Sequence, residues 1–223
     1  MVNHFDYSED YRRFKDSSFE YGVALAKTAG HTALRLADAD VLPFDFRSLY
    51  KTVNGYVSEL IKLSEQTKEN TSAENELIKA NQYKLAADPE KALKTPVLKE
   101  EVPYLDFSPL QNALDKLSKS TEQINDSWNK ALQSGNDVNS FNIGLFQAEQ
   151  QLLTENGLPR RPWYKHTLYA PGFYTGYGVK TMPGIREAIE TNNWKEAQEQ
   201  IKLDAAILVK FSDYLEQLAK NNN

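Results

Sequence analysis

The chain has 223 residues, of which 40% are hydrophobic and 26% are charged, which suits a globular protein with one sizeable core or two small ones. Its formal net charge of −5 argues against a nucleic-acid-binding protein, because such proteins carry a clustered basic surface. The absence of cysteine excludes disulfides, thiol catalysis and thiolate metal sites. No apolar run approaches the ~18 residues of a membrane span, and the N-terminus lacks a signal-peptide pattern. We therefore expect no membrane segment, and the localisation stays open.

Apolar residues recur at helical spacing in the first part of the chain. This spacing predicts a helix over residues 19–36, with Asp16-Ser17-Ser18 as its capping region. Leu42-Pro43 stops it, and Asp45 or Ser48 can cap a second helix. The apolar stripe of this second helix consists of Leu49, Val53, Tyr56, Val57, Leu60 and Leu63. Residues 64–88 are polar but rich in helix-forming residues.

Three further long helices and one short helix are predicted in the second half of the chain. Ser108-Pro109 begins the first of them, whose heptad-like seam is typical of a helix packed along its neighbours. A fourth long helix is expected to end at Asn156-Gly157, and a last one to begin at Asn193-Trp194, after a short helix over residues 185–189. The seam consists of Leu110, Leu114, Leu117, Ile124, Trp128 and Ala131.

No alternating strand pattern is found. The sequence therefore predicts an all-α fold: an antiparallel bundle of four to five long helices in a single domain, residues 1–223, with residues 1–15 as a lead-in.

One long segment, residues 157–185, has no periodicity of its own. Its 29 residues hold four prolines, five glycines and four tyrosines. A loop of this length inside a compact domain is usually functional or disordered, and disordered segments are poor in aromatic residues. We therefore expect a long, ordered Pro/Tyr-rich loop that is packed by its own rings.

The residues alone offer no catalytic machinery. The three histidines, His4, His31 and His166, have no partners at metal-ligand spacing, and no serine-triad or phosphate-loop motif is present. We interpret His31 as a packed core imidazole, and we interpret His166 as a residue that fixes the loop, with a site residue as the alternative. Glu187 and Glu190 are expected on a solvated face or as helix-end charges. The basic group Arg160, Arg161 and Lys165 is expected to pair with acids of the same domain. We predict no catalytic residue, no metal and no cofactor.

Three sequence blocks nevertheless match a known family. They are Val41-Leu42-Pro43-Phe44-Asp45, then residues 102–109 (VPYLDFSP), and then the loop with Arg161-Pro162-Trp163-Tyr164-Lys165-His166, Tyr169-Ala170-Pro171 and Pro183-Gly184-Ile185. In this order, with helices between them, they resemble the C-terminal helical domain of the glutamate carboxypeptidase II and transferrin receptor family, the transferrin receptor-like dimerisation domain. The resemblance covers nearly the whole chain.

The resemblance implies homodimerisation by a domain that follows a zinc-peptidase domain. In such proteins the Pro/Tyr-rich loop faces the substrate cleft, where adjacent Lys and Tyr residues bind the substrate's terminal carboxylate. The Tyr position falls at Tyr177, whereas the Lys position is Gly176. The family's last zinc ligand falls at Val2, two residues from His4, so no ligand remains. The resemblance therefore describes a dimerisation domain whose peptidase domain is absent from this chain.

We expect the chain to associate with itself through apolar helix faces. Candidate interface residues are Tyr50, Tyr56, Phe211 and Tyr214, for each of which a place in the core is the alternative. Two other hypotheses stay open: an engineered monomeric helical-bundle scaffold derived from this domain, and a fragment of a glutamate carboxypeptidase-like zinc hydrolase. If the loop normally packs on a peptidase domain, then Trp163, Phe173, Tyr174 and Tyr177 should be partly exposed in this chain.

Overall fold

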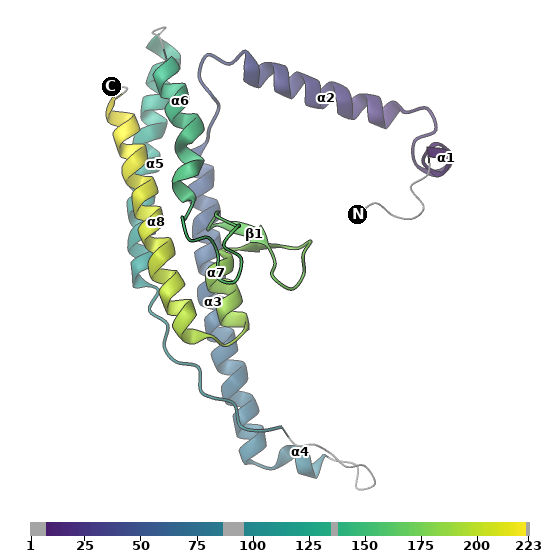
Figure 1. Ribbon diagram of the computed structural model, residues 1–223, viewed down its shortest axis with the longest axis vertical. Coiled ribbons are helices and arrows are strands. Elements are labelled where there is room, and N and C mark those ends of the chain that lie inside the picture. Colours follow the sequence, from purple (N-terminus) through teal and green to yellow (C-terminus); the bar gives the residue numbers. More distant parts are fainter. Residues whose placement is uncertain (1–7, 87–95, 135–137, 222–223) are drawn as a thin grey trace. The chain divides into compact units, whose positions relative to one another are not determined.

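The computed structural model describes residues 8–86, 96–134 and 138–221 (Figure 1). The chain divides into two compact units, residues 1–44 and residues 45–223. Each unit is treated by itself below.

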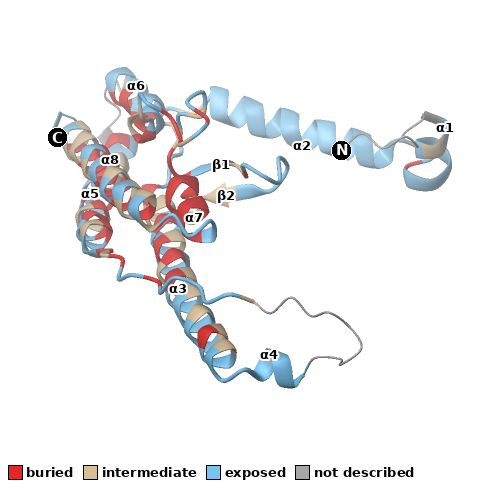
Figure 2. Ribbon diagram, turned by 60° about the horizontal axis from the view of Figure 1, so that its bottom comes forward, coloured by how far each residue is buried: buried red, intermediate tan, exposed pale blue. Residues whose placement is uncertain are grey.

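The first unit is built around one helix without a buried face. Its described part comprises α1 (Ser8–Asp10), a single π-helical stretch (Tyr11–Lys15) and α2 (Glu20–Ala37). The predicted capping region is confirmed, because the Asp16 carboxylate accepts the backbone N–H of Gly22 at 3.0 Å. No residue of α2 is buried, as Figure 2 shows along its whole length. His31 is consequently exposed, and the prediction of a packed imidazole is wrong.

The second unit begins with the long helix α3 (Phe46–Lys79). Asp45 is its N-cap and accepts the backbone N–H of Ser48 at 3.2 Å, so the first of the two predicted caps is confirmed. The helix continues for 34 residues, well past its apolar stripe. A short helix, α4 (Gln82–Leu85), follows. Near the end of α3, the Asn75 side chain bonds both the N–H and the carbonyl of Lys99 at 2.9 Å, which attaches the returning chain to the helix.

The core forms mainly between α5 (Ser108–Ser134) and α8 (Trp194–Asn221), which lie side by side in Figure 1. Three polar contacts give their relative direction: Asp106 with Gln198, Lys116 with Asp213, and Ser127 with the carbonyl of Ala219. Residue numbers rise together along the two helices, so α5 and α8 run parallel. The intervening segment makes this possible, because it returns the chain to the level at which α5 begins.

That intervening segment departs from the predicted fourth helix. The α-helix α6 (Asn139–Gln147) gives way to a 3₁₀ turn (Ala148–Leu152), and Leu153 is extended. The reason lies in the loop that follows: Lys165 accepts the N–H of Thr154 and Leu152 accepts that of Thr167. The chain leaves the helix because its carbonyl and amide groups pair with a returning segment. The short helix α7 (Pro183–Glu190) has Pro183 in its first turn.

The buried residues confirm the all-α fold and the predicted seams. Five of the six seam residues of α5 are buried, and Trp128 is half-buried. Figure 2 shows the buried stripes of α3, α5 and α8. None of the helices in the described ranges is both long and apolar enough to cross a membrane.

Candidate functional site

The predicted loop contains a small β-hairpin that the sequence did not indicate. Strand β1 (Tyr169–Pro171) pairs antiparallel with β2 (Val179–Thr181), and Ala170 lies opposite Lys180. Three residues per strand are too few to show an alternating pattern. The tip is closed by the N–H of Gly172, which donates to the carbonyl of Gly178 at 2.8 Å. Gly176 has a φ of +66°, a conformation that favours glycine.

The hairpin presents aromatic side chains to solvent. Tyr174 is 78% and Tyr177 is 83% exposed, while Trp163 and Phe173 are also exposed. Partial exposure of these four residues was the expectation, and it is confirmed. The rings do pack on neighbours within the loop: Phe173 and Tyr174 meet edge to face with centroids 4.8 Å apart. The loop is thus ordered by its own contacts and leaves its tip unpartnered within the described part of the chain.

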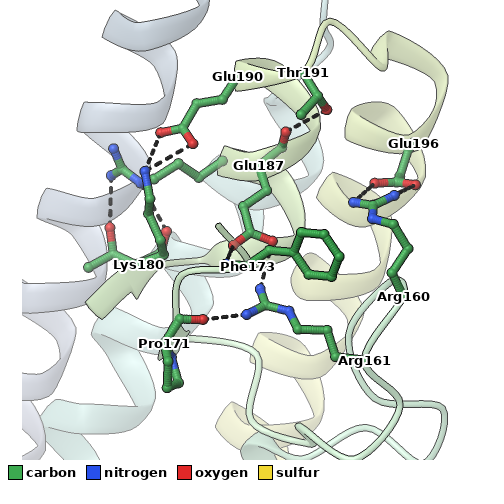
Figure 3. A network of polar contacts seen from close by, with 11 residues as sticks. Arg160, Arg161, Pro171, Phe173, Lys180, Glu187, Glu190, Thr191 and Glu196 are labelled. Carbon is green, nitrogen blue, oxygen red and sulfur yellow. Dashed lines mark hydrogen bonds and ion pairs between the residues drawn. The ribbon is translucent and has the colours of Figure 1, made fainter. Parts of the chain in front are cut away.

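A buried ion pair fastens the base of this hairpin (Figure 3). The Arg161 guanidinium donates to Glu187 at 2.6 Å and also to the carbonyl of Pro171. The other carboxylate oxygen of Glu187 accepts the backbone N–H of Phe173 at 2.9 Å. Arg161 is 3% and Glu187 6% exposed. Together the two side chains fix both ends of the Pro171–Phe173 turn, and we call this pair the Arg161–Glu187 clamp.

Of the predictions about these charged residues, one is wrong and one is correct. Glu187 was expected on a solvated face but is buried, because the loop places Arg161 against it. Arg160, next in the chain, makes the expected surface pairing: a bidentate contact to Glu196 at 2.8 and 2.9 Å. Lys165 donates to the backbone carbonyl of Glu155. The two arginines are therefore paired with acids of their own domain as predicted, whereas Lys165 bonds a backbone carbonyl instead.

Two outer ion pairs hold the hairpin on its helical neighbours. Lys180 of β2 contacts both carboxylate oxygens of Glu190 at 2.7 and 2.9 Å. Arg186 of α7 donates to the Thr181 hydroxyl at 2.7 Å and reaches Glu59 of α3 at 2.8 Å. These exposed contacts join the hairpin to α7, and α7 to α3.

A tight turn at the start of the loop places Arg161. Gly157 has a φ of +68°, and a Cβ atom there would lie 2.3 Å from the carbonyl oxygen of Pro162. Only glycine permits this approach. The N–H of Leu158 donates to the carbonyl of Tyr164 at 2.9 Å and closes the turn. Arg161 therefore sits within a small closed loop that directs its guanidinium inward.

His166 lies at the other side of the hairpin base, as a loop-fixing residue. Its ring stacks on Tyr169 with centroids 4.1 Å apart, and its Nδ1 accepts the backbone N–H of Leu168 at 3.2 Å. The Tyr169 hydroxyl donates to Glu149, which raises the pKa of Tyr169 to about 12. Burial lowers the pKa of His166, with the Glu149 carboxylate acting in the opposite direction.

The candidate interface residues fall into two groups. Phe211 is 1% exposed and packs on Phe46 with ring centroids 6.1 Å apart, so the core alternative holds for it. Tyr50, Tyr56 and Tyr214 are half-buried, and the Tyr214 hydroxyl donates to the carbonyl of Gly144 at 2.8 Å. Beside Tyr214, the outer face of α8 carries a shallow hollow of about 350 Å³. Its lining includes Val209, Lys210 and Asp213.

One buried acid escaped the sequence analysis. Asp204 lies on the buried face of α8, 2% exposed, and its Oδ2 has no hydrogen-bond partner in the described structure. Burial raises its pKa well above the ordinary range of a carboxyl. Asp204 lies three residues after Ile201 and four before Leu208, and this helical spacing could have predicted its burial. Among residues 8–86, 96–134 and 138–221, no cluster of three or more His, Cys, Asp or Glu residues could hold a metal ion.

Comparison with known proteins agrees with this architecture. The family model of the transferrin receptor-like dimerisation domain matches residues 105–216, which include α5, the hairpin, α7 and most of α8. The chain belongs to this family. It is 31% identical over 196 residues to a probable glutamate carboxypeptidase of Arabidopsis thaliana, covering 85% of this chain and 23% of that protein.

Two other relatives carry different peptidase descriptions. An aminopeptidase of Rattus norvegicus is 26% identical over 212 residues, 92% of this chain and 23% of the relative. An inactive zinc metalloprotease of Schizosaccharomyces pombe is 25% identical over 200 residues, 87% of this chain and 21% of the relative. The relatives thus include proteins named as peptidases and one named as an inactive metalloprotease. The chain spans less than a quarter of the length of each of these relatives.

Proposed function

We propose that this chain is a non-catalytic homodimerisation domain. The observation that carries the proposal is the match of residues 105–216 to a family of dimerisation domains. A two-fold dimer uses the same surface on both copies, so that surface must complement itself. The outer face of α8 suits this requirement, because the hollow beside Tyr214 is lined by apolar Val209 and by two opposite charges, Lys210 and Asp213.

The other candidate tyrosines can extend this surface. Tyr50 and Tyr56 are half-buried on α3, where part of each ring is free to contact a second copy. Aromatic residues of this kind are frequent anchors of interfaces. Phe211 does not belong to the proposed surface and instead supports it from the core.

Light scattering on a sizing column across a tenfold concentration range tests the proposal. We expect a constant mass of about 51 kDa, twice the 25.4 kDa of one chain. Lys210→Glu removes the positive half of the complementary pair and should shift the mass toward one chain at the lowest concentrations. Lys84→Glu makes the same charge change on α4 and should leave the dimer intact. A wild-type mass of 25.4 kDa at every concentration would contradict the proposal and favour the monomeric-scaffold hypothesis.

A second candidate function follows from α2, which we propose docks on a peptidase domain. A helix that is apolar around most of its circumference is normally buried. The polar residues Lys27, His31 and Arg35 form one narrow strip, and the rest of α2 is mostly Ala, Gly, Leu and Val. Within its own unit no residue of α2 is buried. The relatives named above are about four times as long and are peptidases or zinc metalloproteases by name, which supports a peptidase domain as the partner.

Hydrogen exchange can test this docking. We expect the α2 amides of the isolated chain to exchange quickly, and to gain protection when the separately produced peptidase region of the Arabidopsis relative is added. Leu25→Glu, on the apolar side, should abolish that gain, whereas Lys27→Glu, on the polar strip, should not. Strong α2 protection in the isolated chain would instead show that the helix already packs within this chain.

A further inference from the structure

The two ring nitrogens of His166 lie in different surroundings. Nδ1 accepts the N–H of Leu168, so in the neutral ring the proton resides on Nε2. Nε2 is buried and has no hydrogen-bond partner among the described residues, and Oε1 of Glu149 is 3.6 Å away. That distance is too long for a hydrogen bond. The neutral imidazole therefore fits this site through Nδ1 alone.

The bond to Leu168 belongs to a short relay across the base of the hairpin. The Leu168 N–H donates to Nδ1 of His166, and the Leu168 carbonyl accepts the N–H of Met182 at 2.7 Å. Met182 is fully buried and directly precedes α7. On the other side, His166 pairs with Leu153 in an isolated β-bridge. Loss of the bond at Nδ1 therefore affects the region where the 3₁₀ turn, β1 and α7 meet.

The charged and titratable groups around His166 are few. The 3₁₀ turn contributes Glu149, β1 contributes Tyr169, and α3 contributes Tyr56, which acts on Tyr169. The neighbouring Lys165 ammonium donates to the carbonyl of Glu155. Glu149 favours the imidazolium, but its Oε1 already accepts the Tyr169 hydroxyl. Protonation at Nδ1 places a second donor against the Leu168 N–H, and that amide then loses its acceptor.

We propose that His166 is an acid-sensitive latch that holds the base of the 169–181 hairpin when neutral and releases it when protonated. Burial lowers the pKa of His166, so it favours the neutral ring in the folded chain. A histidine whose folded pKa lies below its unfolded value of about 6.5 contributes stability above that pH and loses it as the pH falls below. The latch concerns contacts within one chain, so its failure would leave the proposed dimerisation unaffected.

Hydrogen exchange of the whole chain at pH 7.5 and pH 5.5, corrected for the intrinsic pH dependence of exchange, tests the latch. We expect the protection of residues 168–182 to fall about fivefold at pH 5.5, as the loss of one hydrogen bond implies, while the α5 amides keep theirs. The imidazole proton resonances, followed over the same range, should show His166 titrating below about 6.5, the ordinary pKa of an unfolded histidine.

Two substitutions separate the latch from a general effect of acid. His166→Asn keeps an acceptor near the position of Nδ1 without titrating, so its hairpin should stay protected at both pH values. His166→Phe keeps the stacking on Tyr169 but has no acceptor, so protection should be low at both. His31→Asn is the matched control and should behave like wild type. The proposal is overturned if His166→Asn retains the wild-type pH step, or if His166 titrates at or above about 6.5, the pKa of an unfolded histidine.

Discussion

Replacing Glu187 by alanine is expected to lower the free energy of unfolding by about 3–5 kcal/mol, among the largest effects of any single substitution in this chain. The variant leaves the Arg161 guanidinium buried without its carboxylate, and it also removes the acceptor of the Phe173 N–H. Both losses arise at the turn that begins the hairpin tip. Urea unfolding followed by circular dichroism would measure the change, and the fluorescence of Trp163 would report on the loop.

Arg160 provides the matched control for this experiment. It is adjacent in the chain and pairs with Glu196 in a bidentate contact, but the guanidinium is exposed to solvent. We expect Arg160→Ala to cost at most about 1 kcal/mol. The double variant Arg161→Met, Glu187→Leu should recover much of the loss, because it leaves no unpaired buried charge. If Glu187→Ala costs no more than Arg160→Ala, the Arg161–Glu187 clamp is not a stabilising element.

Replacing Asp204 by alanine is expected to stabilise the protein at neutral pH by about 1–3 kcal/mol, the usual cost of a buried polar group without a partner. The sign follows from the pKa, which burial raises in the folded state. The unfolded chain releases the Asp204 proton near pH 3.9, whereas the folded chain retains it. Stability is therefore lost as the pH rises above about 4, by about 1.4 kcal/mol per pH unit until the folded carboxyl also ionises.

Chemical unfolding at pH 4.5, 6.0 and 7.5 would measure this loss. The difference in stability between Asp204→Ala and wild type should widen with rising pH and then level off. Asp204→Asn, whose side chain cannot ionise, should show the same widening as Asp204→Ala. A constant difference for Asp204→Ala across the three pH values would contradict a carboxyl that is protonated in the folded state.

Local chemistry determined much of the helical framework before any tertiary information. The starts of α2 and α3 are each held by a short-range bond to an aspartate, Asp16 and Asp45, so they are visible in a few residues. The seam of α5 follows from periodicity alone. Assignment to the family likewise rested on short Pro-, Gly- and Tyr-containing blocks, and the family model bears it out.

Several features of the site depended on long-range neighbours. The hairpin strands are too short to show a period, and the Arg161–Glu187 clamp joins residues 26 positions apart. Glu187 has the same local pattern as a surface residue of α7, and only its contact with Arg161 makes burial favourable. The prediction for His31 was wrong in the opposite direction: its helix was expected to pack, but no residue of α2 is buried.

The amino-acid sequence by itself thus determined where most of the helices lie, the order of the segments and the family. These depend on interactions within one or two turns and on linear motifs. The tertiary structure alone decided that α5 and α8 run parallel, that Glu187 and Asp204 are buried, and that His166 uses Nδ1 to hold the hairpin. Those outcomes depend on contacts between residues far apart in the sequence and on the burial that these contacts cause. Local spacing of residue types predicts neither.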